Sequence, residues 1–224
     1  MHNNCLQFFA LSLCLSISVY ADDLPTTLPT PSANESPTTI PTTLPVSIDL
    51  SSPKSALRTL SRAMEIGDHD AISKVLLARD ERDQRIIDAL GQFAQAFWRF
   101  REAAVYSFGE EGAVYVTGNL KLANRSFLAI DQATELIQGD SAIVSFDAKQ
   151  NSPALVKVDG SWRMRVNELF DPMQSVRFDL LVTDSIHAID AMKSVTREME
   201  SNYFRTPEDV VQAFLQKLVK KEER

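Results

Sequence analysis

Cysteine is nearly absent from this chain of 224 residues, and its two cysteines, Cys5 and Cys14, both lie before residue 22. That first segment has the features of an export signal, with an apolar stretch over residues 6–19 and small residues at the positions that a signal peptidase reads. We therefore predict a signal peptide over residues 1–21, cleaved after Ala21. The mature chain would then have no thiol, no disulfide and no cysteine ligand for a metal.

Long hydrophobic runs are also lacking. The apolar stretch of the signal is shorter than the ~20 residues that a transmembrane helix needs, and no later run approaches that length. We expect a secreted or periplasmic protein with no integral membrane segment once the signal is removed, and an uncleaved anchor is the alternative.

Glycine-rich loops and basic stripes are the remaining absences. The seven glycines are scattered as turn residues, which excludes a phosphate-binding loop. The chain has 23 basic and 30 acidic residues and a net charge of -7. This balance argues against nucleic acid and anionic membranes as partners.

Proline, by contrast, is concentrated in residues 22–50, together with many threonines. Six of the ten prolines lie there: Pro25, Pro29, Pro31, Pro37, Pro41 and Pro45. Proline has no amide donor, and this stretch has little apolar bulk to bury. We predict a disordered, extended linker that acts as a tether.

Residues 51–170 are expected to form one α+β domain that opens with two short helices. Ser52-Pro53 predicts a helix start, because serine caps free amides and proline suits the first helical position. Gly67 would end this helix, and a second short helix would follow from Asp70.

A long helix is predicted from Glu81 to Phe108, since its apolar residues recur in steps of three or four. Gly109 would close it. Residues 110–127 are ambiguous: Ala113–Thr117 is typical of a short strand, but an irregular connector fits equally well.

From Ala129 the apolar period changes to two, which indicates strands. Four are predicted: Ile130–Ile137, Ala142–Phe146, Ala154–Val158 and Trp162–Val166. Asp159-Gly160 is a strong hairpin signal, because the favoured turns need positive φ at both central residues. Short connections predict a curved antiparallel meander on which the N-terminal helices pack.

Residues 171–224 are predicted to be a C-terminal helical extension, a hairpin of helices Gln174–Asn202 and Pro207–Lys221. A helix of ~15 residues is marginal alone in water, so the apolar face of the second one needs a cover. We expect the long helix of the same chain to provide it, because the connection is short. A second subunit is the alternative.

Two stretches resemble a known superfamily. SPKSALRTLSRAMEIGDHDAI at 52–72 is similar to the first helix pair of the cone-shaped ketosteroid isomerase / nuclear transport factor two-like superfamily. SAIVSF and ALVKVDGSWRMRVNEL, between 141 and 169, resemble its last strands, where a Val-Asp-Gly-x-Trp-Arg turn joins strands facing the cone. The resemblance implies a cone over residues 52–170 in either an enzyme or a binding module. No catalytic motif matches, so it implies no catalytic residue.

The histidines of the mature chain, His69 and His187, are the first candidates for chemistry. His69 lies between Asp68 and Asp70, but adjacent residues cannot all converge on one ion, and no second ligand cluster completes a metal site. We interpret His69 as a loop residue near a helix start.

A triad of Ser185, Asp184 and His187 is also disfavoured. Residues two or three apart on a helix do not face each other well, and no Gly-x-Ser-x-Gly turn is present. We predict a partly buried or exposed helix histidine at 187, and we assign no catalytic, metal or cofactor residue.

The last predicted strand carries alternating side chains. Trp162, Met164 and Val166 would share one face, and Arg163 and Arg165 the other. The first face is expected to be core, with Trp162 inside it or plugging the cone.

An apolar pocket is the alternative to a core position, and its lining would be Trp98, Tyr106, Tyr115 and Trp162. Three carboxylates are candidates for a buried base in such a cone: Asp131, Glu135 and Asp147. Burial among apolar groups would raise the pKa of a carboxyl and suit it to that role.

The interpretation we favour is an exported, non-catalytic binding or interaction module on a flexible tether. It would bind a protein, a wall component or a small apolar ligand, without a cofactor. The alternative is a cofactor-free isomerase or cyclase-like enzyme with a carboxylate base in the apolar cone. A third possibility is a structural protein that assembles through its C-terminal helices.

Overall fold

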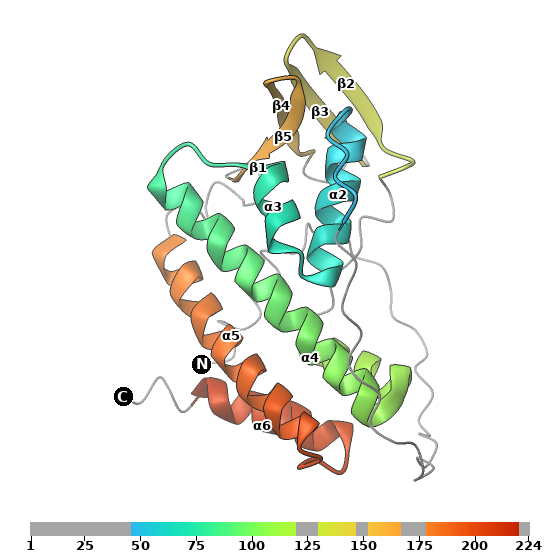
Figure 1. Cartoon of the computed structure of the whole chain (residues 1–224), viewed down its shortest axis with the longest axis vertical. Coiled ribbons are helices and arrows are strands. Elements are labelled where there is room, and N and C mark those ends of the chain that lie inside the picture. Colours follow the sequence, from blue (N-terminus) through green and yellow to red (C-terminus); the bar gives the residue numbers. More distant parts are fainter. Residues whose placement is uncertain (1–45, 120–129, 147–151, 167–177, 220–224) are drawn as a thin grey trace.

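The computed structural model describes residues 46–119, 130–146, 152–166 and 178–219. The predicted signal peptide and residues 22–45 of the predicted linker lie outside these ranges. The fold is α+β, with the sheet and two short helices at one end of a long helix and two further helices beside the other end (Figure 1). No helix in the described part is apolar over a length sufficient to cross a membrane.

The first helix, α2 (Pro53–Ile66), begins and ends where its sequence predicts. The Ser52 hydroxyl accepts a hydrogen bond from the Ser55 amide at 3.1 Å, and Pro53 opens the first turn. Gly67 follows the helix with a φ of 69°, a left-handed conformation that glycine adopts without strain. A side chain here would also collide with α4, because a Cβ atom would lie 2.6 Å from Gln95 Cα.

The second helix, α3 (His69–Val75), is capped by Asp68, whose Oδ1 accepts from the Ala71 amide at 3.0 Å. Strand β1 (Leu76–Leu77) follows at once. The sequence analysis missed this strand, because two leucines directly after an apolar helix have no period of their own.

The long helix α4 (Glu81–Asn119) contains a break at Gly109, where φ is 72° and ψ is 178°. Gly109 therefore ends the first helical run as predicted, but the chain resumes a helix rather than the short strand suggested for Ala113–Thr117. The β-branched residues favour a strand locally. Tertiary packing overrides this preference, because Ala113, Val116 and Thr117 are all buried at helical spacing.

Strands β2 (Thr134–Gln138), β3 (Ser141–Ser145), β4 (Ala154–Val158) and β5 (Ser161–Arg165) pair in antiparallel succession. The sheet order is β1-β5-β4-β3-β2, and β1 lies parallel to β5. The expectation of a purely antiparallel sheet was thus wrong, and the sheet is mixed.

Turn residues set the register of this sheet. Asp159 and Gly160 have φ values of 52° and 80°, which confirms the predicted hairpin turn. The first long strand was predicted from Ile130 but begins at Thr134, because a turn bonds the Ala133 amide to the Ile130 carbonyl at 3.2 Å.

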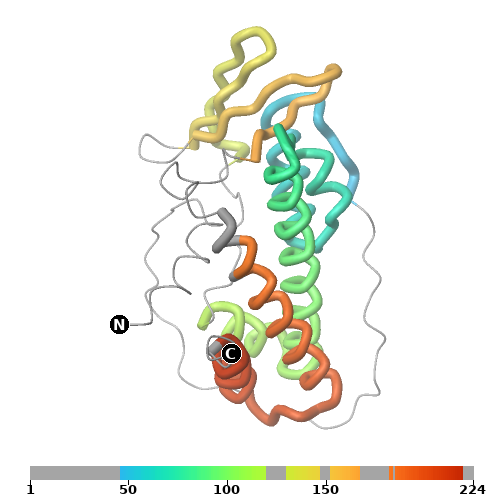
Figure 2. The backbone as a smooth tube through the Cα atoms, turned by 90° about the vertical axis from the view of Figure 1, so that its left-hand side faces the viewer, coloured from blue at the N-terminus to red at the C-terminus, as the bar shows by residue number. Residues whose placement is uncertain are grey.

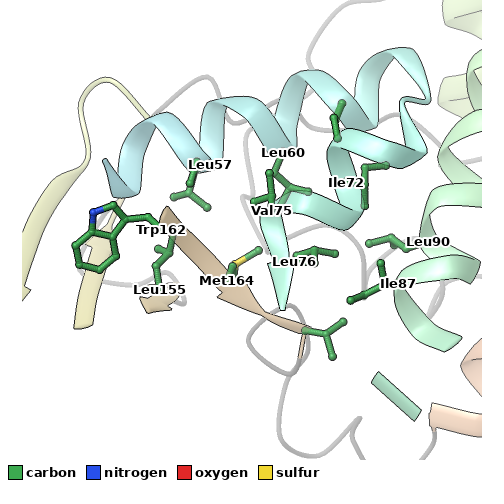
Figure 3. Close-up of a cluster of buried hydrophobic side chains, with 14 of the residues drawn as sticks. Leu57, Leu60, Ile72, Val75, Leu76, Ile87, Leu90, Leu155, Trp162 and Met164 are labelled. Carbon is green, nitrogen blue, oxygen red and sulfur yellow. The ribbon is translucent and has the colours of Figure 1, made fainter. Parts of the chain in front are cut away.

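One hydrophobic cluster fills the space between the inner face of the sheet, α2, α3 and the first turns of α4 (Figure 3). Trp162, Met164 and Val166 point into it, at 4%, 1% and 0% exposure, as their alternation predicts. The labelled side chains of Figure 3 come from the sheet, α2, α3 and α4: Leu57, Leu60, Ile72, Val75, Leu76, Ile87, Leu90, Leu155, Trp162 and Met164.

A second cluster joins the later turns of α4 to α5 (Phe178–Glu200) and α6 (Pro207–Val219). Helix α5 runs beside α4, and α6 turns back to pack on both (Figures 1 and 2). The ring of Phe214 is fully buried, with its centroid 5.9 Å from that of Phe100. The apolar face of α6 is therefore covered by helices of the same chain. The predicted ends of these helices at Gln174 and Lys221 lie outside the described residues.

Residues 46–50 are tied to the domain although they fall in the range 22–50 that the sequence assigned to the linker. The Val46 amide donates to Asp68 Oδ2 at 3.0 Å, and Asp49 exchanges two hydrogen bonds with Thr59, at 3.1 and 3.0 Å. The Leu50 carbonyl accepts from the Trp162 amide at 2.9 Å. This segment therefore runs along α2 to the edge of β5.

Candidate functional site

The turn around His69 is occupied by structural contacts. Each carboxylate oxygen of Asp68 accepts a hydrogen bond, Oδ1 from the Ala71 amide at the start of α3 and Oδ2 from the Val46 amide. The His69 ring lies against Gly91 of α4, and its Nε2 is 3.8 Å from Asp88 Oδ1. Among the described residues, no group of three His, Cys, Asp or Glu side chains is arranged to hold a metal.

Ser185, Asp184 and His187 all lie within four consecutive positions of α5. Ser185 is buried and His187 is half-buried, whereas the Asp184 side chain is outside the described set. Positions two apart on a helix point to different sides, so the helix separates Ser185 from His187.

Two of the three carboxylates that were candidates for a buried base are bonded to groups of α2. Asp131 has a side chain 75% exposed and pairs with Arg58, whose Nε lies 2.9 Å from its Oδ1. Glu135 Oε1 accepts from the Lys54 amide at 2.8 Å, which joins β2 to the first turn of α2. Asp147 lies outside the described residues. The hypothesis of a buried base at Asp131 was therefore wrong.

Asp83 is the one buried charged residue among those that the structure describes, and the sequence analysis did not single it out. Its Oδ2 accepts from the Arg79 amide at 3.0 Å and from Arg79 Nε at 2.8 Å, while its own amide donates to Asp80 Oδ1 at 2.8 Å. The hydrogen bond from the Arg79 side chain lowers the pKa of Asp83, which makes its carboxylate a weaker base than an ordinary aspartate. The pattern Asp80-x-x-Asp83 at a helix start is the sequence signal that could have found this capping arrangement.

The four aromatic residues of the predicted pocket are not brought together. Trp162 belongs to the cluster under the sheet. Tyr106 lies on α4 and is 45% exposed. Tyr115 lies near Glu208 of α6, and its pKa is raised by partial burial and by this carboxylate. Trp98 is also on α4, which extends away from β5 toward α5 and α6 (Figure 1). The pocket interpretation was therefore wrong for this set of residues.

Exposed aliphatic side chains gather instead on the hairpin β2–β3. Leu136, Ile137 and Ile143 are 56%, 51% and 43% exposed. The other large apolar residues that are exposed within the described ranges are distributed over residues 46–50, α4, α5 and the turn after α5: Ile48, Tyr106, Val114, Ile186 and Tyr203. Among the described residues, the hairpin thus has the largest group of exposed aliphatic side chains.

Strand register explains the exposure of Leu136 and Ile143. Leu136 lies opposite Ile143, which lies opposite Ala154, so these side chains share one face of the sheet. The neighbouring residues Ala142 and Val144 point to the other face, which α2 covers, and are 2% and 0% exposed. We call the Leu136 and Ile143 pair the hairpin patch; Ile137 lies opposite Ala142 and therefore on the other face, where it is 51% exposed.

The position of β2 adds a second feature to the hairpin patch. Strand β2 is the last strand of the sheet order, so within the described ranges its far edge has no strand partner. The hairpin and the α5–α6 turn lie at opposite ends of the molecule (Figures 1 and 2). Unpaired backbone groups therefore run beside exposed aliphatic side chains at one end of the molecule.

Comparison of this chain with protein-family models, with curated proteins and with solved structures gave no match.

Proposed function

We propose that this protein is an exported, non-catalytic interaction module that binds a protein partner through the hairpin patch. The signal over 1–21 would direct export and be removed after Ala21, and the linker would let the domain reach its partner. We also retain the cone-shaped superfamily as a proposed relation for residues 52–170, on the motifs that suggested it.

The hairpin patch is the observation that carries this proposal. Its aliphatic side chains remain exposed although the same strands bury Ala142 and Val144 well. A protein partner fits better than a small apolar ligand, because the patch lies on a projecting hairpin and combines side chains with a free strand edge.

Site-specific photo-crosslinking tests the proposal in the organism that exports the protein. A photoreactive residue replaces Leu136 in one variant and Ile186, an equally exposed aliphatic residue of α5, in the control. We expect discrete protein adducts from position 136 that are absent from position 186. The absence of adducts from position 136 would refute the proposed function.

N-terminal sequencing of the exported protein tests the first part of the proposal. We expect the mature chain to begin at Asp22. A chain that retains Met1 in the membrane fraction would show that the segment is an anchor.

A further inference from the structure

We infer that the partner of the hairpin patch is a second copy of this chain, whose β2 pairs antiparallel with β2 about a two-fold axis at Leu136. This inference rests on the proposed function, since it names the occupant of the same surface. It requires no change in the described fold, because the far edge of β2 already faces outward at the end of the sheet.

The two edges of the sheet differ in how they are protected. Proteins blunt exposed edge strands by making them very short or by placing lysine or proline on them. At one edge, β1 has only two residues, and beside it the Leu50 carbonyl accepts a hydrogen bond from the Trp162 amide of β5. Strand β2 has five residues, Thr-Glu-Leu-Ile-Gln, with neither lysine nor proline. Its one charge, Glu135, is bonded to the Lys54 amide of α2.

Charge selects the register of the self-pairing. With the axis at Leu136, Thr134 faces Gln138 of the second copy, and Glu135 faces Ile137. All five residues of the strand are then used, and no like charges are opposed. An axis at Glu135 would place two carboxylates opposite each other, which is unfavourable in a sheet.

The same register extends the aliphatic surface across the axis. Leu136 and Ile143 lie side by side on one face, and Leu136 of the second copy continues the row to its own Ile143. Two-fold symmetry places all four side chains on the same face of the joined sheet. The strands β2 and β3 carry no other charge than Glu135, so the net charge of -7 is not concentrated where the copies meet.

Sedimentation velocity of residues 22–224 measures the association directly. We expect a concentration-dependent dimer, and we expect L136K and L136E each to weaken it at least about tenfold, since each opposes like charges across the axis. An equimolar mixture of L136K and L136E should recover a heterodimer, because opposite charges then meet. I186K, at a comparably exposed position, should dimerise as the unmodified chain does.

Cysteine crosslinking tests the register, because the chain from residue 22 onward has no cysteine of its own. L136C should form a disulfide-linked dimer under mild oxidation, since residues directly opposite in an antiparallel pair have Cα atoms about 4.5–5.5 Å apart. T134C should not, because its two copies would lie about 14 Å apart along the strands.

Three outcomes overturn the inference: an unmodified chain that stays monomeric up to its solubility limit, an L136K variant that dimerises unchanged, or faster crosslinking of T134C than of L136C. A monomeric chain whose position 136 still crosslinks to another protein would refute this inference and leave the proposed function standing. Loss of every adduct at position 136 would refute both.

Discussion

Replacement of Phe214 by alanine tests how α6 is held to the rest of the protein. The ring is 0% exposed and lies between α4, α5 and α6, in contact with Phe100. Truncating a buried phenylalanine costs ~3–5 kcal/mol, and the cost is high where the surroundings cannot collapse into the cavity. The packing of α6 on α4 and α5 restricts collapse, so we expect a loss of about 4 kcal/mol.

Urea denaturation followed by circular dichroism measures this loss. Leu218 and Gln216 provide matched controls on the same helix, because Leu218 is half-buried and Gln216 is exposed. Leu218→Ala should cost clearly less than Phe214→Ala, and Gln216→Ala should change the free energy of unfolding by less than ~0.5 kcal/mol. A double-mutant cycle with Phe100→Ala should give a coupling of about 0.5–1.5 kcal/mol for the ring pair.

The reasoning fails if Phe214→Ala behaves like Gln216→Ala. A cost below ~1 kcal/mol would mean that α6 is not docked on α4 in solution, since no core truncation of this size is so mild. The fluorescence of Trp162 in a Trp98→Phe background reports separately on the cluster under the sheet, because Trp162 lies there and Phe214 does not. Loss of circular dichroism before the Trp162 signal changes would show that the two clusters unfold separately.

Three further substitutions test other parts of the structure. Trp162→Ala should cost ~3 kcal/mol or more by urea denaturation, and a cost under ~1 kcal/mol would place Trp162 on the surface. Asp83→Asn should cost about 1–2 kcal/mol at pH 7, because it removes charge-assisted hydrogen bonds to Arg79. The pKa of Asp83 is lowered in the folded state, so its contribution is present above the ordinary value near ~3.9 and is lost as the pH falls through the lower folded value. The denaturation midpoints of the unmodified chain and Asp83→Asn should therefore converge in acid, and a constant difference down to the lowest pH would contradict the assignment. Gly91→Ala would place a Cβ atom 1.9 Å from His69 Cδ2. The substitution should therefore lower the free energy of unfolding by about 1–2 kcal/mol more in the unmodified chain than in a His69→Ala background. Equal effects in the two backgrounds would show that the ring does not pack on Gly91.

Much of the helical architecture could be predicted because its signals are local. Ser52-Pro53 and Gly67 bound one helix by capping chemistry that needs no distant partner, and Asp159-Gly160 sets a hairpin by its own backbone preference. Gly109 likewise breaks α4 wherever the rest of the chain lies.

The features that the sequence did not reveal depend on distant contacts. Leu76–Leu77 is a strand only because β5 lies beside it, and Ala113–Thr117 is helical because this part of α4 packs in one cluster with α5 and α6. The local sequence of either segment contains no information about those neighbours.

The candidate site is the least predictable part, for a geometric reason. Ile143 alternates with the buried residues Ala142 and Val144, and a period of two shows that the faces of a strand differ without showing which face is covered. Glu135 and Asp131 were likewise considered as buried bases, although contacts with α2 some 70 to 80 positions away determine their surroundings.

The attachment of residues 46–50 has a mechanical consequence. Any pull that reaches the domain through the preceding residues acts first on Val46 and its bond to Asp68, and only then on the bonds of Asp49 and Leu50. When a pull loads hydrogen bonds one after another, they break in turn, and the force needed is lower than when all of them are loaded together. Release of these five residues would add about 17 Å of chain before α2 carries the load. The segment would therefore act as a short extensible link that yields before the cluster under the sheet is strained.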